Sequence, residues 1–547
     1  MKCFEREMNT HLFGNPHSRS PSSMLSTDRI ESTRVMALDF FKADPEHFDL
    51  IFVANATAAI KLVTDCMSDY SRSKESKGFW FGYHGDSHTS LVGMREVAGS
   101  NLRCFDLDGD VEEWLRRSER SMSQCGHDLP NQDGPVGLFA YPAQSNMNGR
   151  RLPLHWPGRL RATNSASREV YTLLDAAAFV ATGQLDLSDE KNAPDFVALS
   201  FYKIFGFPDL GALIVRKKSG HILKARRYFG GGTVDMVING SGDAMWHAKK
   251  ASQLHEMVED GTPAFHSIAA LGIALETHQR LFGSMANVSK HTCILSNLLY
   301  RRMSSLAHAN GQPVCQIYKG TSSEYGDSES QGPTVAFNVL TSRGEWIGKS
   351  DFESLAILNN IQIRTGGVCN PGGIATCLRV SPVKMRENFD EGVRCGNDLD
   401  EIDGKPTGVI RVSLGAMSSR KDIEYFVNFM HLFVDMEPNK EQSIASWSSQ
   451  MSAEKPSLPT TAQSTKLQAM IRVEEGPSSY ECPVAACIGL FGAKDELMDH
   501  LHVHRNDVKG RTASPSTKKR RSLWRILTCC GGSNYNQRHW LRKFVIA

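Results

Sequence analysis

The chain has 547 residues, of which 40% are hydrophobic and 22% are charged, and its formal net charge is +2. This composition is ordinary for a globular protein with a sizeable core. No apolar run approaches the roughly 18 residues of a membrane span, and the thirteen irregularly spaced cysteines, with no leader sequence before them, do not suit an extracellular disulfide scaffold. We therefore expect reduced thiols in the cytoplasm or the nucleus, and no membrane partner.

Short runs typical of β-strands alternate with helical stretches over residues 50–435, which favours an α/β fold with a largely parallel sheet. The predicted strands of the first part lie at 51–53, 136–141, 170–174, 196–200 and 212–215, with a helix at 56–67. Later runs predict a smaller α+β domain closed by an amphipathic helix. These are the strands 334–340, 360–366 and 408–415 and the helix 422–435.

Lys203 follows a predicted buried strand, and Asp175 ends the strand before it. A lysine at this place can present its amine in an active site, where desolvation lowers the pKa and leaves the amine nucleophilic. In enzymes that use pyridoxal phosphate (PLP), an Asp pairs with the pyridinium nitrogen and a Lys forms the Schiff base. Each residue alone has an ordinary explanation, as a lysine that extends to solvent and an Asp that caps a helix. Together and in this order they predict a PLP site.

The composition changes after the closing helix. Residues 437–475 are rich in Ser, Thr, Gln and Pro and predict a disordered linker. A cysteine and histidine array follows within 476–510, and 511–547 is a basic tail. Residues 501–547 hold eleven Lys or Arg against one acid, Asp507.

The array has the C-x4-C-x12-H-x3-H spacing of a C2H2 zinc finger. Its candidate ligands are Cys482, Cys487, His500 and His504. Two thiolates and two imidazoles at this spacing can close a tetrahedral zinc shell. A single finger reads only about three base pairs, so we infer no transcription factor. The basic run 518–525 has three open explanations, namely nuclear import, contact with nucleic acid phosphates, and a solvated tail.

Eight ordered stretches resemble the class V aminotransferase family and, within it, the molybdenum cofactor sulfurases. They lie at 12–23, 52–63, 86–96, 139–154, 199–215, 228–234, 259–271 and 363–373. The resemblance implies a PLP-dependent transferase of fold type I, with a large domain at 1–300, a small domain at 301–436, and a homodimeric assembly. The family's upstream strand-and-turn segment and its β-rich C-terminal domain, which binds the molybdenum cofactor, find no match here, so we expect the large domain to be shortened.

The resemblance also implies how the cofactor is held. Ala56 and Thr57, at the start of a helix after a strand, are assigned to the cofactor phosphate together with Ser200, since helix N-termini favour anions. Thr233 is assigned to the partner subunit's site. His88 is assigned to the face of the cofactor ring.

Three further residues take their roles from the same resemblance. Asn146 is expected to bond the cofactor's phenolic oxygen, the more so because bacterial cysteine desulfurases often carry a Gln where this chain has Ala178. Cys369 lies in a loop rich in Gly and Pro and is expected to carry a persulfide, since a mobile, exposed thiolate is a good nucleophile. Arg411 is expected to hold the substrate carboxylate, which a guanidinium fork fits.

The implied reaction is a cysteine desulfuration. Lys203 moves the α-proton of L-cysteine, the Cys369 thiolate takes the sulfur, and L-alanine remains. The family's acceptor is the molybdenum cofactor or its carrier, which serves xanthine dehydrogenase and aldehyde oxidase. Two other hypotheses stay open. A related lyase or selenocysteine-directed desulfurase keeps Lys203 and Asp175 without requiring Cys369, and an inactive scaffold uses its zinc finger and basic tail to bind protein or nucleic acid.

Overall fold

The structure is a computed structural model that describes residues 2–74, 76, 78–99, 101–123, 136–165, 168–436, 480–481 and 490–491. Residues up to 436 belong to one compact unit. A second unit contains the antiparallel pair β17 (Tyr480–Glu481) and β18 (Leu490–Phe491). Outside the described residues lie the predicted zinc ligands Cys482, Cys487, His500 and His504, the linker 437–475 and the basic tail 511–547.

No group of His, Cys, Asp or Glu side chains within the described part of the chain is placed to hold a metal ion. None of the helices in that part is long and apolar enough to cross a membrane.

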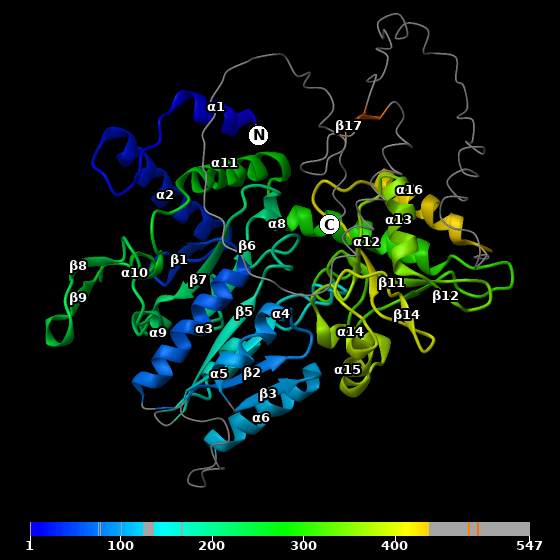
Figure 1. The fold of residues 1–547 in the computed structure, drawn as a ribbon, viewed down its shortest axis with the longest axis horizontal. Coiled ribbons are helices and arrows are strands. Elements are labelled where there is room, and N and C mark those ends of the chain that lie inside the picture. The colour runs from blue at the N-terminus through cyan, green and yellow to red at the C-terminus, as the bar shows by residue number, and fades with distance from the viewer. Residues whose placement is uncertain are drawn as a thin grey trace, which may run out of the picture. The chain divides into compact units, whose positions relative to one another are not determined.

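A seven-stranded mixed sheet forms the centre of the first unit, with the strand order β1-β7-β6-β5-β4-β2-β3 (Figure 1). Its strands are β1 (Phe48–Val53), β2 (Trp80–His84), β3 (Leu102–Phe105), β4 (Val136–Pro142), β5 (Glu169–Asp175), β6 (Phe196–Ser200) and β7 (Gly211–Arg216). The strands from β2 to β6 run parallel to one another, whereas β7 is antiparallel to both β1 and β6. The predicted α/β fold with a largely parallel sheet is confirmed.

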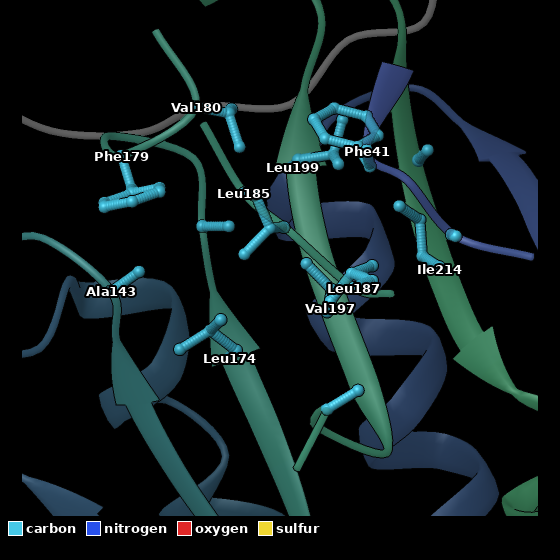
Figure 2. Close-up of a cluster of buried hydrophobic side chains, with 14 of the residues drawn as sticks. Phe41, Ala143, Leu174, Phe179, Val180, Leu185, Leu187, Val197, Leu199 and Ile214 are labelled. Atoms are coloured by element: carbon cyan, nitrogen blue, oxygen red, sulfur yellow. The ribbon is translucent and has the colours of Figure 1, made fainter. Parts of the chain in front are cut away.

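Helices cover both faces of this sheet, and each face has its own hydrophobic core. One core includes α2 (Pro21–Phe40), α6 (Asp108–Ser123), α7 (Trp156–Arg161) and α11 (Phe265–Phe282); the other includes α3 (Ala56–Ser73), α9 (His221–Lys224) and α10 (Leu254–Val258). Successive side chains of β6 alternate between the two cores, as the pleat of a strand requires. Val197 and Leu199 pack on the first core beside Leu174 and Ile214 (Figure 2), whereas Phe196 packs on the second.

The direction of β7 follows from a short connection. Residues 201–210, which include the one-turn helix α8 (Tyr202–Phe205), join β6 to β7. A parallel return needs a crossover of about a dozen residues or more, so the chain turns back antiparallel. As a result, Lys203 lies directly after the end of β6.

A second, five-stranded sheet follows along the chain. It has the order β10-β11-β16-β13, with β12 paired to β11. Its strands are β10 (Cys315–Ile317), β11 (Thr334–Leu340), β12 (Trp346–Ile347), β13 (Arg364–Gly366) and β16 (Val409–Ser413), and its core takes in α12 (Met285–Ser304), α13 (Lys349–Leu358) and α16 (Arg420–Met430). The boundary predicted at residue 300 falls inside α12. Leu295 and Met303, on either side of that boundary, both belong to the core of the five-stranded sheet.

Two predicted elements are shorter than expected. The strand predicted at 360–366 is reduced to Arg364–Gly366, because Asn360 adopts a left-handed backbone with φ 54°. The helix predicted at 422–435 ends at Met430 and continues as a 3-10 turn over His431–Phe433. The other elements are α1 (Lys2–Thr10), α4 (Thr89–Val92), α5 (Arg95–Ala98), α14 (Pro371–Leu378), α15 (Pro382–Asp390), β8 (Val234–Ile238), β9 (Trp246–Lys249), β14 (Glu401–Ile402) and β15 (Lys405–Pro406).

Candidate active site

A pocket of about 170 Å³ opens where β4, β5 and β6 end. Ligands of open α/β sheets bind outside the carboxyl ends of the strands, so its place in the fold is that of a binding site. Its lining consists of Asn55, Ala56, Thr57, Ile60, His88, Ser90, Pro142, Gln144, Asn146, Asp175, Ala177, Ala178, Ser200, Tyr202 and Lys203. Every predicted cofactor residue except Thr233 belongs to this set.

The amino end of α3 forms one wall of the pocket. Asn55 caps the helix, and its Oδ1 accepts a hydrogen bond from Ala58 N at 3.0 Å. Ala56 N donates to Ser200 Oγ at 3.0 Å, which joins the helix start to the end of β6. A Cβ on Gly211 would lie 2.5 Å from Asn55 Cα, so a glycine at the start of β7 is needed for this close approach. The dipole of the helix end favours an anion here.

His88 and its neighbours form a second wall. Thr57 Oγ1 lies 2.8 Å from Ser90 Oγ, and Ser90 N donates to His88 Nδ1 at 3.1 Å. The proton of the neutral ring therefore lies on Nε2. Burial lowers the pKa of His88; the Asp175 carboxylate raises it, and the Lys203 ammonium lowers it, with a net decrease. His88 is thus a neutral imidazole at pH 7 that lies within electrostatic reach of both groups.

Asp175 ends β5, and Lys203 follows the end of the adjacent strand β6. Asp175 is buried at the end of β5, and its Oδ1 accepts a hydrogen bond from Ala177 N at 3.0 Å. Lys203 lies on α8, which ends at Gly206 with φ 75°. The side chain of Lys203 is exposed at the pocket wall. The sequence predicts a desolvated amine at this position, and the structure differs because α8 carries the lysine three residues beyond the buried strand.

The loop that carries Cys369 reaches this pocket from the second sheet. It joins β13 to α14, and Cys369 is half-buried in it. Asn146 Nδ2, in the pocket lining, donates to Val368 O at 2.7 Å. Thr89 N donates to Cys369 O at 2.9 Å. The structure therefore brings the predicted nucleophile and the predicted cofactor residues together.

Arg411 lies on β16 beside the same loop. Its NH1 donates to Asn146 O at 2.6 Å. Burial and, to a smaller extent, the positive charge of Arg364 lower the pKa of Arg411 to about 10, although Cys369 acts in the opposite direction. Arg364 is the residue paired with Arg411 across β13 and β16, so the two side chains share one face of the sheet. Neither arginine lines the pocket itself, and Arg411 is joined to it through the backbone of Asn146.

The sequence over residues 5–426 matches the family described as aminotransferase class-V. The chain belongs to this family. Molybdenum cofactor sulfurase of Aspergillus niger is 54% identical over 440 residues, which cover 80% of this chain and 51% of the relative. The sulfurase of Aspergillus terreus is 55% identical over 437 residues, with coverage of 80% and 51%. The predicted resemblance is confirmed, and the chain spans about half the length of these curated relatives.

Solved structures share the fold of this class-V aminotransferase. A cysteine desulfurase from Thermococcus onnurineus NA1 aligns with a TM-score of 0.58 at 18% identity, covering 79% of this chain and 90% of the other. The cysteine desulfurase CsdA from Escherichia coli aligns with a TM-score of 0.55 at 18% identity, covering 79% and 91%. The cystine C-S lyase C-DES, solved with cysteine persulfide, gives 0.52 at 15% identity, with coverage of 79% and 93%.

Thr233 is the predicted cofactor residue of this class-V aminotransferase that does not line the pocket. It is fully buried, its Oγ1 donates to Gly230 O at 2.8 Å, and the same oxygen accepts a hydrogen bond from Gly230 N at 3.1 Å. The hydroxyl therefore stabilises the turn before β8. Its reach into a partner subunit stays a prediction.

Gln144 is a pocket residue that the sequence analysis missed. Its Nε2 donates to Ala178 O at 3.4 Å, and its Oε1 accepts from Arg151 Nε at 3.1 Å. The side chain thus places an amide beside Ala178, where bacterial cysteine desulfurases often carry a Gln. Its position two residues before Asn146, in the same motif, is the sequence feature that could have marked Gln144 as a pocket residue.

A larger hollow of about 640 Å³ contains none of the predicted site residues. Two pairs of its charged side chains lie at ion-pair distance. Arg34 NH1 lies 2.7 Å from Glu259 Oε1, and His255 Nδ1 lies 2.9 Å from Asp49 Oδ1. Because these groups satisfy each other and the smaller pocket collects the chemically active ones, we place the candidate active site in the smaller pocket.

Proposed function

We propose that the chain is a PLP-dependent cysteine desulfurase of the molybdenum cofactor sulfurase type. It takes sulfur from L-cysteine, releases L-alanine, and carries the sulfur as a persulfide on Cys369. The observation that carries the proposal is the bond between Asn146, which lines the same pocket as Lys203, and the backbone of the Cys369 loop. The 54% identity to a molybdenum cofactor sulfurase supports it.

The groups around the pocket fit PLP. The amino end of α3, with Ala56 and Thr57, offers the helix dipole and the Thr57 hydroxyl to a phosphate, and Ser200 adds a second hydroxyl. The buried Asp175 carboxylate suits a protonated ring nitrogen, and the neutral imidazole of His88 suits the ring face. When bound, PLP supplies an electron sink next to the substrate's α-carbon.

The chain's own residues then have separate tasks in the reaction. Arg411 binds the carboxylate of L-cysteine, since a half-buried guanidinium beside a second positive charge favours an anion. Lys203 removes the α-proton and returns it. The Cys369 thiolate attacks the substrate sulfur, so that an S–S bond forms as the C–S bond breaks. The pair of electrons from the C–S bond stays with carbon, which takes up a proton and becomes the methyl group of alanine.

A homodimer is part of the proposal. The hairpin of β8 and β9, which follows Thr233, exposes large apolar side chains to solvent. They are Met236, Val237, Ile238, Met245 and Trp246. Apolar side chains gathered on one hairpin indicate a protein interface. Sedimentation of the purified chain as a monomer would contradict this part.

The sulfur acceptor and the functions of the C-terminal residues are proposed without contacts in the described structure. The molybdenum cofactor or its carrier is proposed as acceptor from the names of the relatives, of which the chain spans about half. A structural zinc ion, nuclear entry and nucleic-acid binding stay predictions from residue spacing. They concern residues beyond the described part of the chain. Zinc content of the purified full chain, measured by elemental analysis, tests the first of these.

The direct test of the proposal uses the purified full chain loaded with PLP. We expect an absorbance band near about 420 nm, which is a property of the lysine-linked cofactor, and release of L-alanine from L-cysteine in the presence of a thiol reductant that discharges the persulfide. Absence of both would support the inactive scaffold and overturn the proposal.

Replacing Arg411 by glutamine is expected to lower kcat/KM for L-cysteine by about 100-fold, mainly through KM. The reason is that a charge-assisted hydrogen bond to a carboxylate contributes about 1.5–3 kcal/mol in both the ground state and the transition state. The measurement is steady-state alanine release. The matched control is Arg420→Gln, since Arg420 is an exposed arginine on α16 that pairs with Glu424. Equal KM values for the wild type and the Arg411 variant would remove Arg411 from the carboxylate site.

A further inference from the structure

The segment that carries Cys369 is fastened to the large domain at three consecutive residues. The carbonyl of Val368 accepts from Asn146 Nδ2 at 2.7 Å, and the carbonyl of Cys369 accepts from Thr89 N at 2.9 Å. Asn370 Nδ2 then donates to Asp86 Oδ1 at 2.7 Å. The loop is therefore held by specific polar contacts between the two sheets' domains and not by apolar packing alone.

Asn370 is the most constrained of these anchors. It is fully buried, and it caps α14 through a hydrogen bond from Gly373 N to its Oδ1 at 2.9 Å. Its Nδ2 also donates to Asn146 Oδ1 at 3.0 Å. The Asn370 side chain thus has two functions: its oxygen caps the helix, and its amino group binds the large domain.

Asp86 is held in place to receive this contact. Its Oδ1 also accepts from Ser145 Oγ at 2.8 Å, and Arg150 NH2 lies 3.3 Å from its Oδ2. Arg150 in turn pairs with Asp108 at 2.7 Å. The carboxylate is therefore fixed and charged, and a hydrogen bond to a charged group is worth more than one between neutral groups.

The backbones also meet closely beside this pair. A Cβ on Gly372 would lie 2.1 Å from the carbonyl oxygen of Gly85, which follows β2. Any larger residue at 372 must push the start of α14 away from the large domain. Gly367, at the other end of the loop, has open space around it and an ordinary φ, so a methyl group there meets nothing.

The loop is strained where the anchors hold it. Val368 and Cys369 have φ values of 43° and 55°, in the left-handed region. A residue with a branched Cβ, such as Val368, adopts this region only where surrounding contacts impose it. The anchors therefore hold the backbone of this segment against its own conformational preference.

We propose that Asn370 and Asp86 form a latch that positions Cys369 at the pocket in one state and releases it in another. This rests on the proposed function for its purpose: the latched loop takes sulfur from the substrate, and the released loop presents the persulfide to an acceptor. Asn370 and Asp86 are positioning residues, since they act through the loop and touch neither reacting group.

The test separates the latch from the helix cap. Asn370→Asp keeps an acceptor for Gly373 N, because Asp is as good an N-cap as Asn, but it replaces the donor to Asp86 by a second carboxylate. Gly372→Ala opens the latch by backbone contact instead. Gly367→Ala is the matched control. The readout is the rate at which iodoacetamide alkylates Cys369 in the full chain loaded with PLP, followed by mass spectrometry of the peptide that contains Cys369.

We expect Asn370→Asp and Gly372→Ala to raise the alkylation rate about tenfold, the change in an opening equilibrium that accompanies loss of one hydrogen bond to a charged group. Gly367→Ala stays within twofold of the wild type. In the same variants kcat for alanine release falls about tenfold, while KM stays within twofold.

A double variant, Asp86→Asn with Asn370→Asp, reverses the polarity of the pair and restores a donor opposite an acceptor. It is expected to bring the alkylation rate back to within threefold of the wild type. Equal alkylation in the wild type and both single variants, or no recovery in the double variant, overturns the latch. The alkylation series does not depend on turnover, so a chain that releases no alanine refutes the proposed function and still tests the latch.

Discussion

Replacing Lys203 by alanine is expected to reduce the rate of alanine formation about 1,000-fold or more, because a positioned proton-transfer group contributes roughly 10²–10⁴-fold and the covalent link to the cofactor is lost as well. The absorbance band near about 420 nm disappears for the same reason. The measurements are alanine release from L-cysteine and the spectrum of the PLP-loaded chain.

The loss of activity is not expected to come from unfolding. Lys203 is exposed on a one-turn helix, and surface substitutions usually change the free energy of unfolding by less than about 0.5 kcal/mol. Lys224→Ala is the matched control, since Lys224 is an exposed lysine on another one-turn helix and does not line the pocket. If the Lys203 variant retains a tenth of the activity or keeps the band, the lysine of the cofactor site lies elsewhere.

The part of the site built on the large sheet could be predicted from the sequence. Asp175 and Ser200 end consecutive apolar strands, and the ends of adjacent parallel strands meet at one edge of a sheet. The antiparallel direction of β7 could be predicted as well, because the connection after β6 has only ten residues, too few for a parallel crossover. Local patterns were sufficient in both cases because the contacts join neighbours in chain order.

The contacts between the two domains could not be predicted in this way. Asn146 and Val368 are 222 residues apart, and Asn370 and Asp86 are 284 apart. No spacing rule connects such residues, since their meeting depends on how α14 docks against the end of β2. Gln144 could not be predicted for a related reason, since its contact with the backbone of Ala178 joins residues 34 positions apart, at the ends of two neighbouring strands.

Replacing Cys369 by alanine is expected to reduce alanine formation at least about 100-fold, because an external thiol must then replace a nucleophile held at the site, where effective concentrations far exceed those of dissolved thiols. The cofactor band is retained, since Cys369 belongs to the loop after β13 and not to the sheet that lines the pocket floor. Cys395→Ala is the matched control, as Cys395 is an exposed cysteine of the same domain.

The Lys203 and Cys369 variants together separate the three hypotheses about the reaction. A desulfurase loses alanine release in both variants but keeps the cofactor band in the second. A lyase that releases sulfide without a protein acceptor depends on Lys203 alone, so unchanged turnover in Cys369→Ala would contradict the persulfide step while leaving the cofactor site intact. A scaffold shows neither band nor turnover before any substitution is made. The distance in sequence between Lys203 and Cys369 makes the comparison informative, because each residue reaches the pocket from a different sheet and one can be removed without disturbing the other.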